Sequence, residues 1–161
     1  MHIREAVEDD LEAMWGIFRA VTATGDTLPF ADTMDRDTFR AHWFGPGQVT
    51  CVAEEDVHLL GMYKLGANYP DLGSHVASAT YLVRPEVQGR GIGRALVQHS
   101  IARAQDADYL AMQFNYVVST NRAAVTLYEE LGFEIVGTLP KAFRHAEKGL
   151  VDAFVMHRFL Q

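Results

Sequence analysis

The sequence predicts a single α/β domain over residues 1–161, with a central mixed sheet and helices on both faces. Short apolar runs suited to strands alternate with longer segments whose apolar residues recur at the helical period. A glycine-rich turn joins one of these apolar runs directly to a helical segment. With 161 residues, 48% of them hydrophobic and 22% charged, the chain is long enough for one full hydrophobic core.

The N-terminal part is expected to hold one strand and two helices. His2–Val7 has the composition of a short strand, and Asp9 and Asp10 are candidate N-caps for the helix that follows. The apolar residues of that helix recur at i, i+3, i+4 and i+7, at Leu11, Met14, Trp15 and Phe18. The run Thr24–Phe30 breaks the helix because it contains glycine and proline, and a second helix is expected over Asp35–Phe44.

The middle and C-terminal parts are expected to combine strands with two more helices. The strands are predicted over Val49–Glu54, His58–Leu65, Val76–Val83, Tyr109–Val117, Phe133–Gly137 and Leu150–Phe159. One helix is expected from Ile92 to Ala107-Asp108, and another over Arg122–Leu131. The run Ser119-Thr120-Asn121 offers capping side chains for the last helix, and Gly132 is a natural stop.

The bulk composition argues against several classes of protein. The net charge of −7 disfavours a general nucleic-acid binder, because an acidic surface repels phosphates. The single cysteine, Cys51, rules out an internal disulfide, and its apolar neighbours favour a buried strand position over a catalytic thiol. No stretch approaches the ~20 apolar residues that span a membrane, and Met1–Glu5 lacks the apolar core of a signal peptide, so a cytoplasmic location is expected. No clustered set of ligand side chains predicts a metal site.

The segment Gln88–Gly93 has the features of an anion site. An apolar strand precedes it, its glycines let backbone N–H groups converge, and the helix after it offers unpaired N–H groups and a positive dipole end. Two phosphate-binding patterns, G-x-G-x-x-G and G-x-x-x-x-G-K-[ST], do not fit, because Arg94 stands where each requires glycine. The pattern that fits is Q/R-x-x-G-x-G/A.

This pattern resembles the acetyl-CoA pyrophosphate loop of the GNAT superfamily of N-acyltransferases. A second hallmark of that family, N-x-x-A-x-x-L-Y-x-x-L-G-F, is matched by Asn121–Phe133. The 28 residues from Gly93 to Asn121 are enough for one helix and one strand, as the family requires. The two motifs cover the C-terminal half, while the N-terminal half matches only in its order of elements. The resemblance implies the GNAT fold, acetyl-CoA as co-substrate and direct acetyl transfer to a primary amine.

The resemblance also implies roles for individual residues. Tyr128 is expected near the thioester sulfur as general acid, although its position also suits a half-buried core residue. Asn121 is expected to contact the cofactor, and it can also cap its helix. The strand before the glycine loop is expected to bulge and to splay from its neighbour, so that its main chain pairs with the pantetheine arm. The expected cofactor contacts are Leu82, Val83, Arg84, Gln88, Gly89, Arg90, Gly91, Ile92, Gly93, Arg94 and Asn121. At least one of these arginines is expected to offset the phosphates, and the others to be solvated.

The proton acceptor is not assigned by the motifs. Many relatives place a glutamate on the strand before the glycine loop, but His75–Tyr81 contains no carboxylate. Water relaying the proton to Glu54, Glu55, His75 or His145 is the alternative, with no ranking among them. Asn115 lies where the next strand should splay, and it is expected either to orient the acetyl carbonyl or a water, or to serve as a strand-end turn residue.

The acceptor is expected to contact two variable segments. Thr24–Phe30 is a candidate rim in which Asp26 can pair with a cationic amine, and in the later loop Gly137–His145 Arg144 can hold a carboxylate. The latter segment is loosely similar to phosphinothricin-type amino-acid acetyltransferases. A small-molecule amine is therefore expected as the partner, in place of nucleic acid or membrane. A protein N-terminus or lysine, and a non-catalytic acyl-CoA-binding module, are the alternatives. GNAT relatives often dimerise, which adds a homodimer as a further expectation.

Overall fold

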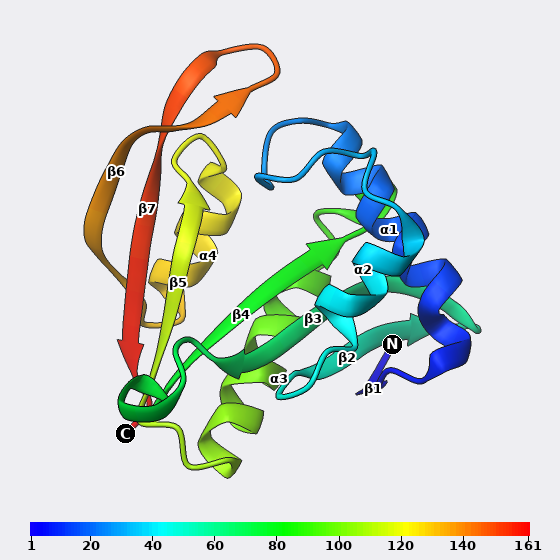
Figure 1. Cartoon of the computed structure of the whole chain (residues 1–161), viewed down its shortest axis with the longest axis horizontal. Helices are drawn as coiled ribbons and strands as arrows, with labels where there is room; N and C mark the ends of the chain where they lie inside the picture. Colours follow the sequence, from blue (N-terminus) through cyan, green and yellow to red (C-terminus); the bar gives the residue numbers. More distant parts are fainter.

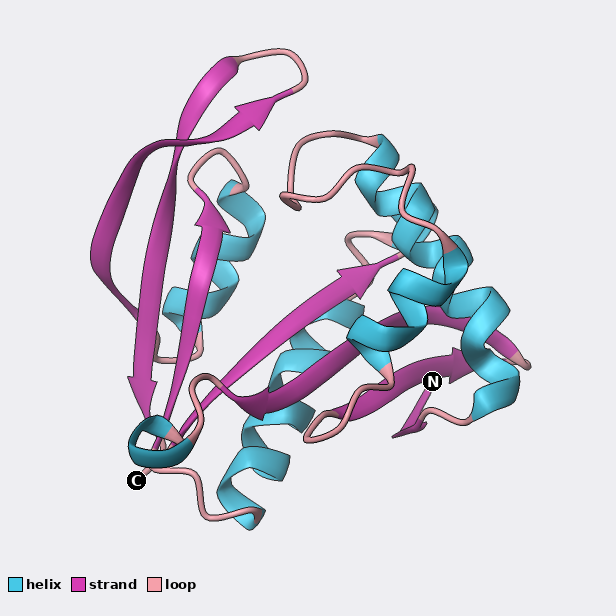
Figure 2. Cartoon of the chain, in the orientation of Figure 1, coloured by secondary structure: helices cyan, strands magenta, loops and turns pink.

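The computed structural model describes all 161 residues and contains one seven-stranded mixed sheet with strand order β1-β2-β3-β4-β5-β7-β6 (Figures 1 and 2). The strands are β1 (His2–Glu5), β2 (Val49–Glu55), β3 (His58–Ala67), β4 (Val76–Val83), β5 (Ala111–Val118), β6 (Glu134–His145) and β7 (Gly149–Phe159). The helices are α1 (Leu11–Ala23), α2 (Arg36–Trp43), α3 (Ile92–Asp106) and α4 (Arg122–Glu130). The predicted α/β class and mixed sheet are confirmed.

The sheet is antiparallel everywhere except between β4 and β5. A parallel pair cannot be joined by a tight hairpin, and here α3 forms the crossover. The crossover brings the C-terminal end of β4 next to the N-terminus of α3. The segment predicted to bind an anion therefore lies beyond the C-terminal end of β4, at the end of the strand remote from its parallel pairing with β5.

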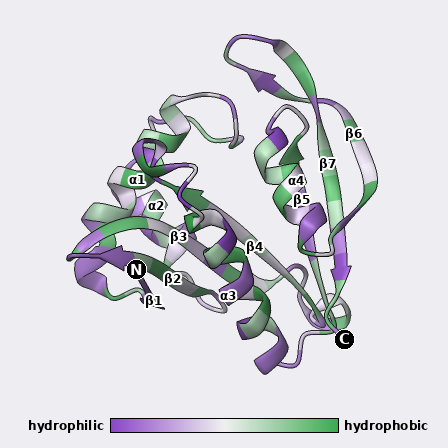
Figure 3. Ribbon diagram, turned by 180° about the vertical axis from the view of Figure 1, so that it is seen from behind, coloured by the Kyte–Doolittle hydropathy of each residue, from purple (hydrophilic) through white to green (hydrophobic).

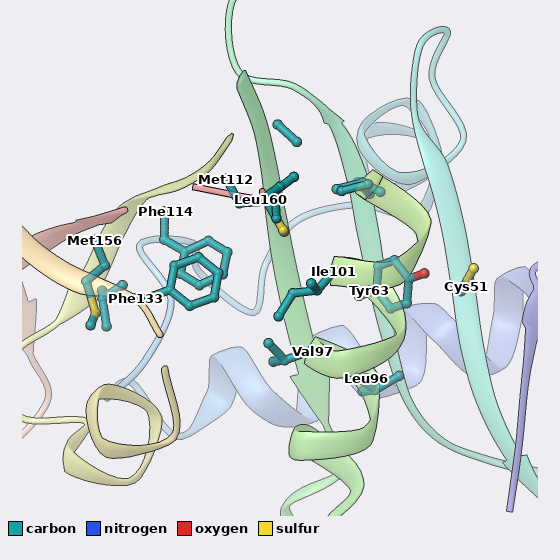
Figure 4. Packing of buried hydrophobic residues seen from close by; sticks show 14 of the residues in the cluster. Cys51, Tyr63, Leu96, Val97, Ile101, Met112, Phe114, Phe133, Met156 and Leu160 are labelled. Atoms are coloured by element: carbon teal, nitrogen blue, oxygen red, sulfur yellow. The ribbon is translucent and has the colours of Figure 1, made fainter. Parts of the chain in front are cut away.

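Two hydrophobic clusters hold helices against opposite faces of the sheet, as predicted. One cluster joins α1 and α2 to side chains such as Val52, Met62 and Leu82. The other joins α3 and α4 to the opposite face, and Figure 4 shows part of it around Leu96, Ile101 and Phe114. The helices carry both hydrophobic and hydrophilic segments in Figure 3, as expected for helices that each cover one face. No helix is long and apolar enough to cross a membrane.

Cys51 lies in the centre of β2 and is fully buried, as its apolar neighbours predict. Burial raises the pKa of its thiol, which keeps the sulfur protonated and unreactive. The preference for a buried strand position over a catalytic thiol is thus confirmed.

Only β4 has the predicted bounds; β2 and β7 differ by one residue at one end, β1, β3 and β5 by up to two, and β6 by the most. β1 ends at Glu5, and β5 runs over Ala111–Val118. The prediction that β6 ends at Gly137 is wrong, because the strand continues to His145. It pairs with β7 across two register shifts, between Ile135 and Gly137 and between Leu139 and Phe143. The second shift contains Pro140 and the left-handed Lys141, residues that signal a loop in a sequence.

Asp10 stands at the N-cap position of α1, but its side chain does not cap that helix. Its carboxylate instead accepts hydrogen bonds from the backbone N–H of Val7 at 2.8 Å and from both terminal nitrogens of Arg4, at 2.8 and 3.0 Å. The Arg4 hydrogen bond is the main reason why the pKa of Asp10 lies below its usual value. The interaction joins β1 to the start of α1.

The Asp10→Ala variant is expected to lower the free energy of unfolding by about 2 kcal/mol at pH 7, because a largely buried, charge-assisted pair is lost. A lowered folded-state pKa contributes stability above the unfolded value of about 3.9 and loses it as pH falls through the folded value. The deficit should therefore shrink in urea unfolding measured at pH 3. The exposed neighbour Asp9, changed to Ala, is the matched control. A deficit independent of pH would contradict this role.

Candidate active site

The main opening in the sheet lies between β4 and β5. These strands pair only at Val76–Ala111 and Ala77–Met112, after which they diverge (Figure 1). The remaining residues of β4, Ser78–Val83, pair with β3 on one side and have no strand partner on the other. The predicted splay is confirmed. The bulge is not in β4 as predicted, because the pairing of β3 with β4 is regular and the register shift lies in β5, between Phe114 and Val117.

A cavity of about 700 Å³ fills this opening and extends from the glycine loop to the α1–α2 loop. Most residues predicted to bind the cofactor or to take part in catalysis line it. They are Leu82, Val83, Gln88, Gly89, Gly91, Ile92, Gly93, Arg94, Asn115, Asn121 and Tyr128. Arg84 and Arg90 were predicted as well, but they do not line the cavity.

The glycine loop presents a cradle of backbone donors. The N–H groups from Gly89 to Arg94 donate no backbone hydrogen bond, because they precede α3 or form its first turn. Gly89 and Gly91 adopt left-handed φ angles of +83° and +82°, and a Cβ added at either would meet no protein atom within 4 Å. The space beside these two glycines is open cavity, so the segment has the geometry of an anion site at a helix N-terminus.

The three arginines near the loop are all engaged with the protein. Arg84 donates its Nε to the carbonyl of Leu59 at 2.5 Å, and its backbone N–H to Leu60 at 2.9 Å. Arg90 pairs with Glu55 at 2.9 Å, whereas Arg94 pairs with Glu130 and also lines the cavity. Of the three, only Arg94 is positioned to offset charge in the cavity.

Tyr128 projects from α4 into an aromatic group at the opening. Its ring centroid lies 4.6 Å from that of Phe114 and 6.1 Å from those of Tyr81 and Phe133. Tyr128 lines the cavity, and its hydroxyl forms no hydrogen bond within the protein. Burial raises the pKa of the Tyr128 hydroxyl well above its usual value, so it stays protonated at neutral pH. It is both a core residue and a free proton donor facing the cavity.

Asn121 and Asn115 both line the cavity, from the start of α4 and from β5. The Asn121 side chain accepts a hydrogen bond from the backbone N–H of Ala124 at 3.3 Å, so it caps α4 while also lining the cavity. Asn115 donates to the side chain of Asn68 at 2.6 Å and accepts from Gln113 at 2.9 Å. These bonds fix the Asn115 amide across the base of the opening.

Sequence reasoning did not single out Tyr81, which lines the cavity beneath Tyr128. The Tyr81 hydroxyl donates to Ser100 at 2.6 Å, since the Ser100 hydroxyl itself donates to the carbonyl of Val97 at 2.7 Å. The alternation of side chains between the two faces of β4 could have indicated Tyr81 from the sequence, because it places Ala79, Tyr81 and Val83 on the face that packs on α3. Tyr81 therefore supports the Tyr128 ring without offering a free proton.

None of the four proposed proton acceptors reaches the cavity. Glu54 pairs with Arg4 at 3.2 Å, and Glu55 with Arg90. His75 precedes β4 at the closed end of the opening, where its carbonyl accepts from Leu110. The Nδ1 atom of His145 accepts from the backbone of the β6–β7 turn. The only carboxylate that lines the cavity is that of Asp26.

A second pocket of about 430 Å³ adjoins the first and shares four of its lining residues. These shared residues are Leu28, Pro29, Phe30 and Tyr116. The second pocket lies between the α1–α2 loop and β6, and Asp32 and Arg144 contribute its charged groups. Both segments predicted to contact the acceptor line this pocket, although the later one is a strand, and their contact with an acceptor stays a prediction. No group of three or more His, Cys, Asp or Glu side chains is arranged to hold a metal ion.

Comparisons with known proteins agree with this geometry. The model of the GNAT acetyltransferase family matches residues 8–133. The L-amino acid N-acyltransferase MnaT of Escherichia coli is 28% identical over 146 residues, which cover 88% of this chain and 84% of that protein. Several other relatives are longer proteins, of which the chain spans only 13% to 32%.

Solved structures agree along nearly the whole chain. A GCN5-related N-acetyltransferase from Kribbella flavida is 39% identical with a TM-score of 0.94, and the match covers 98% of this chain and 96% of that one. The acetyltransferase yncA from Salmonella typhimurium, solved with its cofactor acetyl-CoA, is 25% identical with a TM-score of 0.87, over 100% of this chain and 94% of that one. The chain belongs to the GNAT family of acetyltransferases, and it is an acetyl-CoA-dependent N-acyltransferase.

Proposed function

We propose that the chain transfers the acetyl group of acetyl-CoA to the primary amine of a small molecule of the amino-acid type. The observation that carries the proposal is the pair of adjoining pockets. One contains the backbone cradle and Tyr128, and the other contains Arg144. An acceptor held in the second pocket reaches the first past Tyr116 and Phe30, which line both.

The residues of the larger cavity fit acetyl-CoA. The open space beside Gly89 and Gly91, with unpaired N–H groups around it, suits a pyrophosphate, and Arg94 adds a positive charge. The free edge of β4 at Leu82 and Val83 offers main-chain groups to an extended amide-containing arm, as in strand addition. Asn121 borders the same path from the start of α4. Acetyl-CoA supplies the activated acyl group as a thioester.

Tyr128 suits the step in which the sulfur leaves. A protonated phenol with no partner in the protein can donate a hydrogen bond to the negative charge that develops on the thiolate. The cavity contains no cysteine and no serine in contact with a base, so direct attack by the amine fits better than a covalent acyl-enzyme. The Asn115 amide, fixed by Asn68 and Gln113, is placed to orient the acetyl oxygen or a water.

Arg144 favours an acceptor that carries a carboxylate. It lines the second pocket and takes part in none of the ion pairs of the structure, so its guanidinium is free for a ligand. Arginine binds carboxylates through two parallel hydrogen bonds, which gives affinity and orientation together. The name of the relative MnaT, an L-amino acid N-acyltransferase, supports the same class of acceptor.

The test is a free-thiol release assay with acetyl-CoA across amino acids, polyamines, aminoglycosides and short peptides. Amino acids or their analogues are expected to be the best acceptors. The Arg144→Gln variant should raise KM for a carboxylate-bearing acceptor about tenfold, a loss of about 1.4 kcal/mol, with a much smaller effect on its amide derivative. Peptides as the best acceptors would favour a protein acetyltransferase. Binding of acetyl-CoA without turnover of any amine would favour a non-catalytic acyl-CoA-binding module.

A further inference from the structure

Asp26 is the one acidic side chain in a cavity that otherwise lacks a proton acceptor. The larger cavity has no Glu, His or Lys in its lining. Asp26 is half-buried there and forms no ion pair. Its single hydrogen bond within the protein joins Oδ1 to the Thr24 hydroxyl at 2.5 Å. The other carboxylate oxygen, Oδ2, has no partner.

The loop that carries Asp26 is fixed against the β6–β7 arm rather than left to solvent. The carbonyl of Gly25 accepts a hydrogen bond from the backbone N–H of Ala146 at 2.9 Å. Gly25 has a φ of +65°, and a Cβ added to it would lie only 2.8 Å from the Cβ of Ala146. Glycine is required here because of both the left-handed backbone and the close approach. The contact holds the neighbouring carboxylate in one place.

Thr27, the residue after Asp26, also lines the cavity. Its hydroxyl is fully buried and has no hydrogen-bond partner in the protein, although the residue lines the cavity next to Asp26. A buried hydroxyl without a partner costs free energy, so such groups are usually satisfied by a ligand or an ordered water. Because the Thr27 oxygen is buried away from the cavity, an ordered water is its expected partner, and the free oxygen of Asp26 is the group at this point that an ammonium can reach.

We propose that Asp26 binds the ammonium group of the acceptor and accepts a proton from its nitrogen, which frees the electron pair that then forms the new C–N bond. In this step the nitrogen bonds to the acetyl carbon and the C–S bond breaks. One proton passes from nitrogen to Asp26 and then to solvent before the attack, because an ammonium nitrogen has no free electron pair. As the C–S bond breaks, Tyr128 donates its proton to the sulfur, and the second nitrogen proton passes through water to the Tyr128 oxygen and restores the phenol. The overall change is ammonium plus thioester to amide, thiol and one released proton. This inference rests on the proposed function.

The other charged and titratable groups around Asp26 are compatible with this role. Arg94 lies at the opposite end of the cavity and is paired with Glu130. Tyr81, Tyr116 and Tyr128 face the cavity with pKa values raised by burial, so they carry no charge at neutral pH. Arg144 and Asp32 face the adjoining pocket and provide one charge of each sign. Asp26 is the only group on these elements that can take a proton from the amine in the cavity itself.

The test compares wild type with Asp26→Asn, which keeps the shape of the side chain but removes its charge. For an acceptor that is protonated at pH 7, kcat/KM is expected to fall about 100-fold, the usual contribution of a positioned general base. The affinity for acetyl-CoA, measured by calorimetry, should not change. The deficit should shrink as pH approaches the pKa of the acceptor, and also with an aminooxy or hydrazine analogue that is neutral at pH 7. Asp9→Asn, which removes an exposed unpaired carboxylate elsewhere, is expected to behave as wild type.

The outcomes separate this inference from the function on which it rests. A wild type that binds acetyl-CoA but acetylates no amine contradicts the proposed function. An active wild type with an equally active Asp26→Asn variant contradicts the role of Asp26 and leaves the function intact. An equal deficit at every pH and for neutral and protonated acceptors would show that Asp26 only shapes the loop.

Discussion

Replacing Tyr128 with phenylalanine is expected to lower kcat at least about tenfold, with little change in the affinity for acetyl-CoA. The ring packs against Phe114, Tyr81 and Phe133, and phenylalanine can keep all of these contacts. The hydroxyl has no partner within the protein, so its removal leaves no buried group unsatisfied. The variant should therefore fold normally and lose only the hydrogen bond to the departing sulfur.

Steady-state kinetics together with calorimetry measure the two effects separately. Tyr63→Phe is the matched control. Tyr63 is also a buried tyrosine, but its hydroxyl forms a hydrogen bond with Nδ1 of His99 and it lies outside the cavity. A fall in kcat for Tyr128→Phe and not for Tyr63→Phe indicates a role in the transition state. Unchanged turnover of Tyr128→Phe would leave this tyrosine as a core residue only, which is the alternative that the sequence offers.

Placing glutamate at Gly91 is expected to abolish acetyl-CoA binding. The φ of +82° costs a non-glycine residue about 1–2 kcal/mol, and the added side chain would enter the open space beside the backbone donors. A carboxylate there both fills the cradle and repels phosphate. Calorimetry should detect no binding at cofactor concentrations that saturate wild type.

Two further variants separate backbone strain from occupation of the cradle. Gly47 has a φ of +77° with equally open space around it, but it lies in the turn before β2 and outside both pockets. Gly47→Glu should therefore lose a similar amount of stability and still bind acetyl-CoA. Gly91→Ala, which adds only a methyl group, should bind with intermediate affinity. Normal affinity of Gly91→Glu would refute the assignment of the loop.

The parts of the site that could be predicted from sequence are those fixed by local structure. Gly89 and Gly91 require left-handed backbone, and Asn121 caps the helix that it begins, so neighbouring residues determine their positions. Tyr128 lies seven residues after Asn121 on that same helix, so the helix geometry also determines its position. These features depend on short-range geometry, which a motif records completely.

The errors arise where distant residues decide the outcome. Arg90 is diverted from the cavity by Glu55, 35 residues earlier, and no local pattern shows that pairing. The continuation of β6 past Pro140 depends on β7, which supplies ladder partners on both sides of the bulge. The role of Asp26 depends on the packing of Gly25 against Ala146, over a hundred residues away along the chain. Sequence alone thus named the rim segment and Asp26 within it, without showing that Asp26 is the only carboxylate to line the cavity.

Because only two residue pairs join β4 to β5, the sheet consists of two halves that are hydrogen-bonded to each other over a short stretch. Beyond these pairs, the two halves are linked by helix packing, by the Arg94–Glu130 ion pair, by the Asn68–Asn115 hydrogen bond and by the contact between Gly25 and Ala146. A long extended ligand along the free edge of β4, as proposed above, would contact both halves and hold them together. The free energy of unfolding then rises with the logarithm of the acetyl-CoA concentration, so we expect the folded protein to be most stable where acetyl-CoA is abundant.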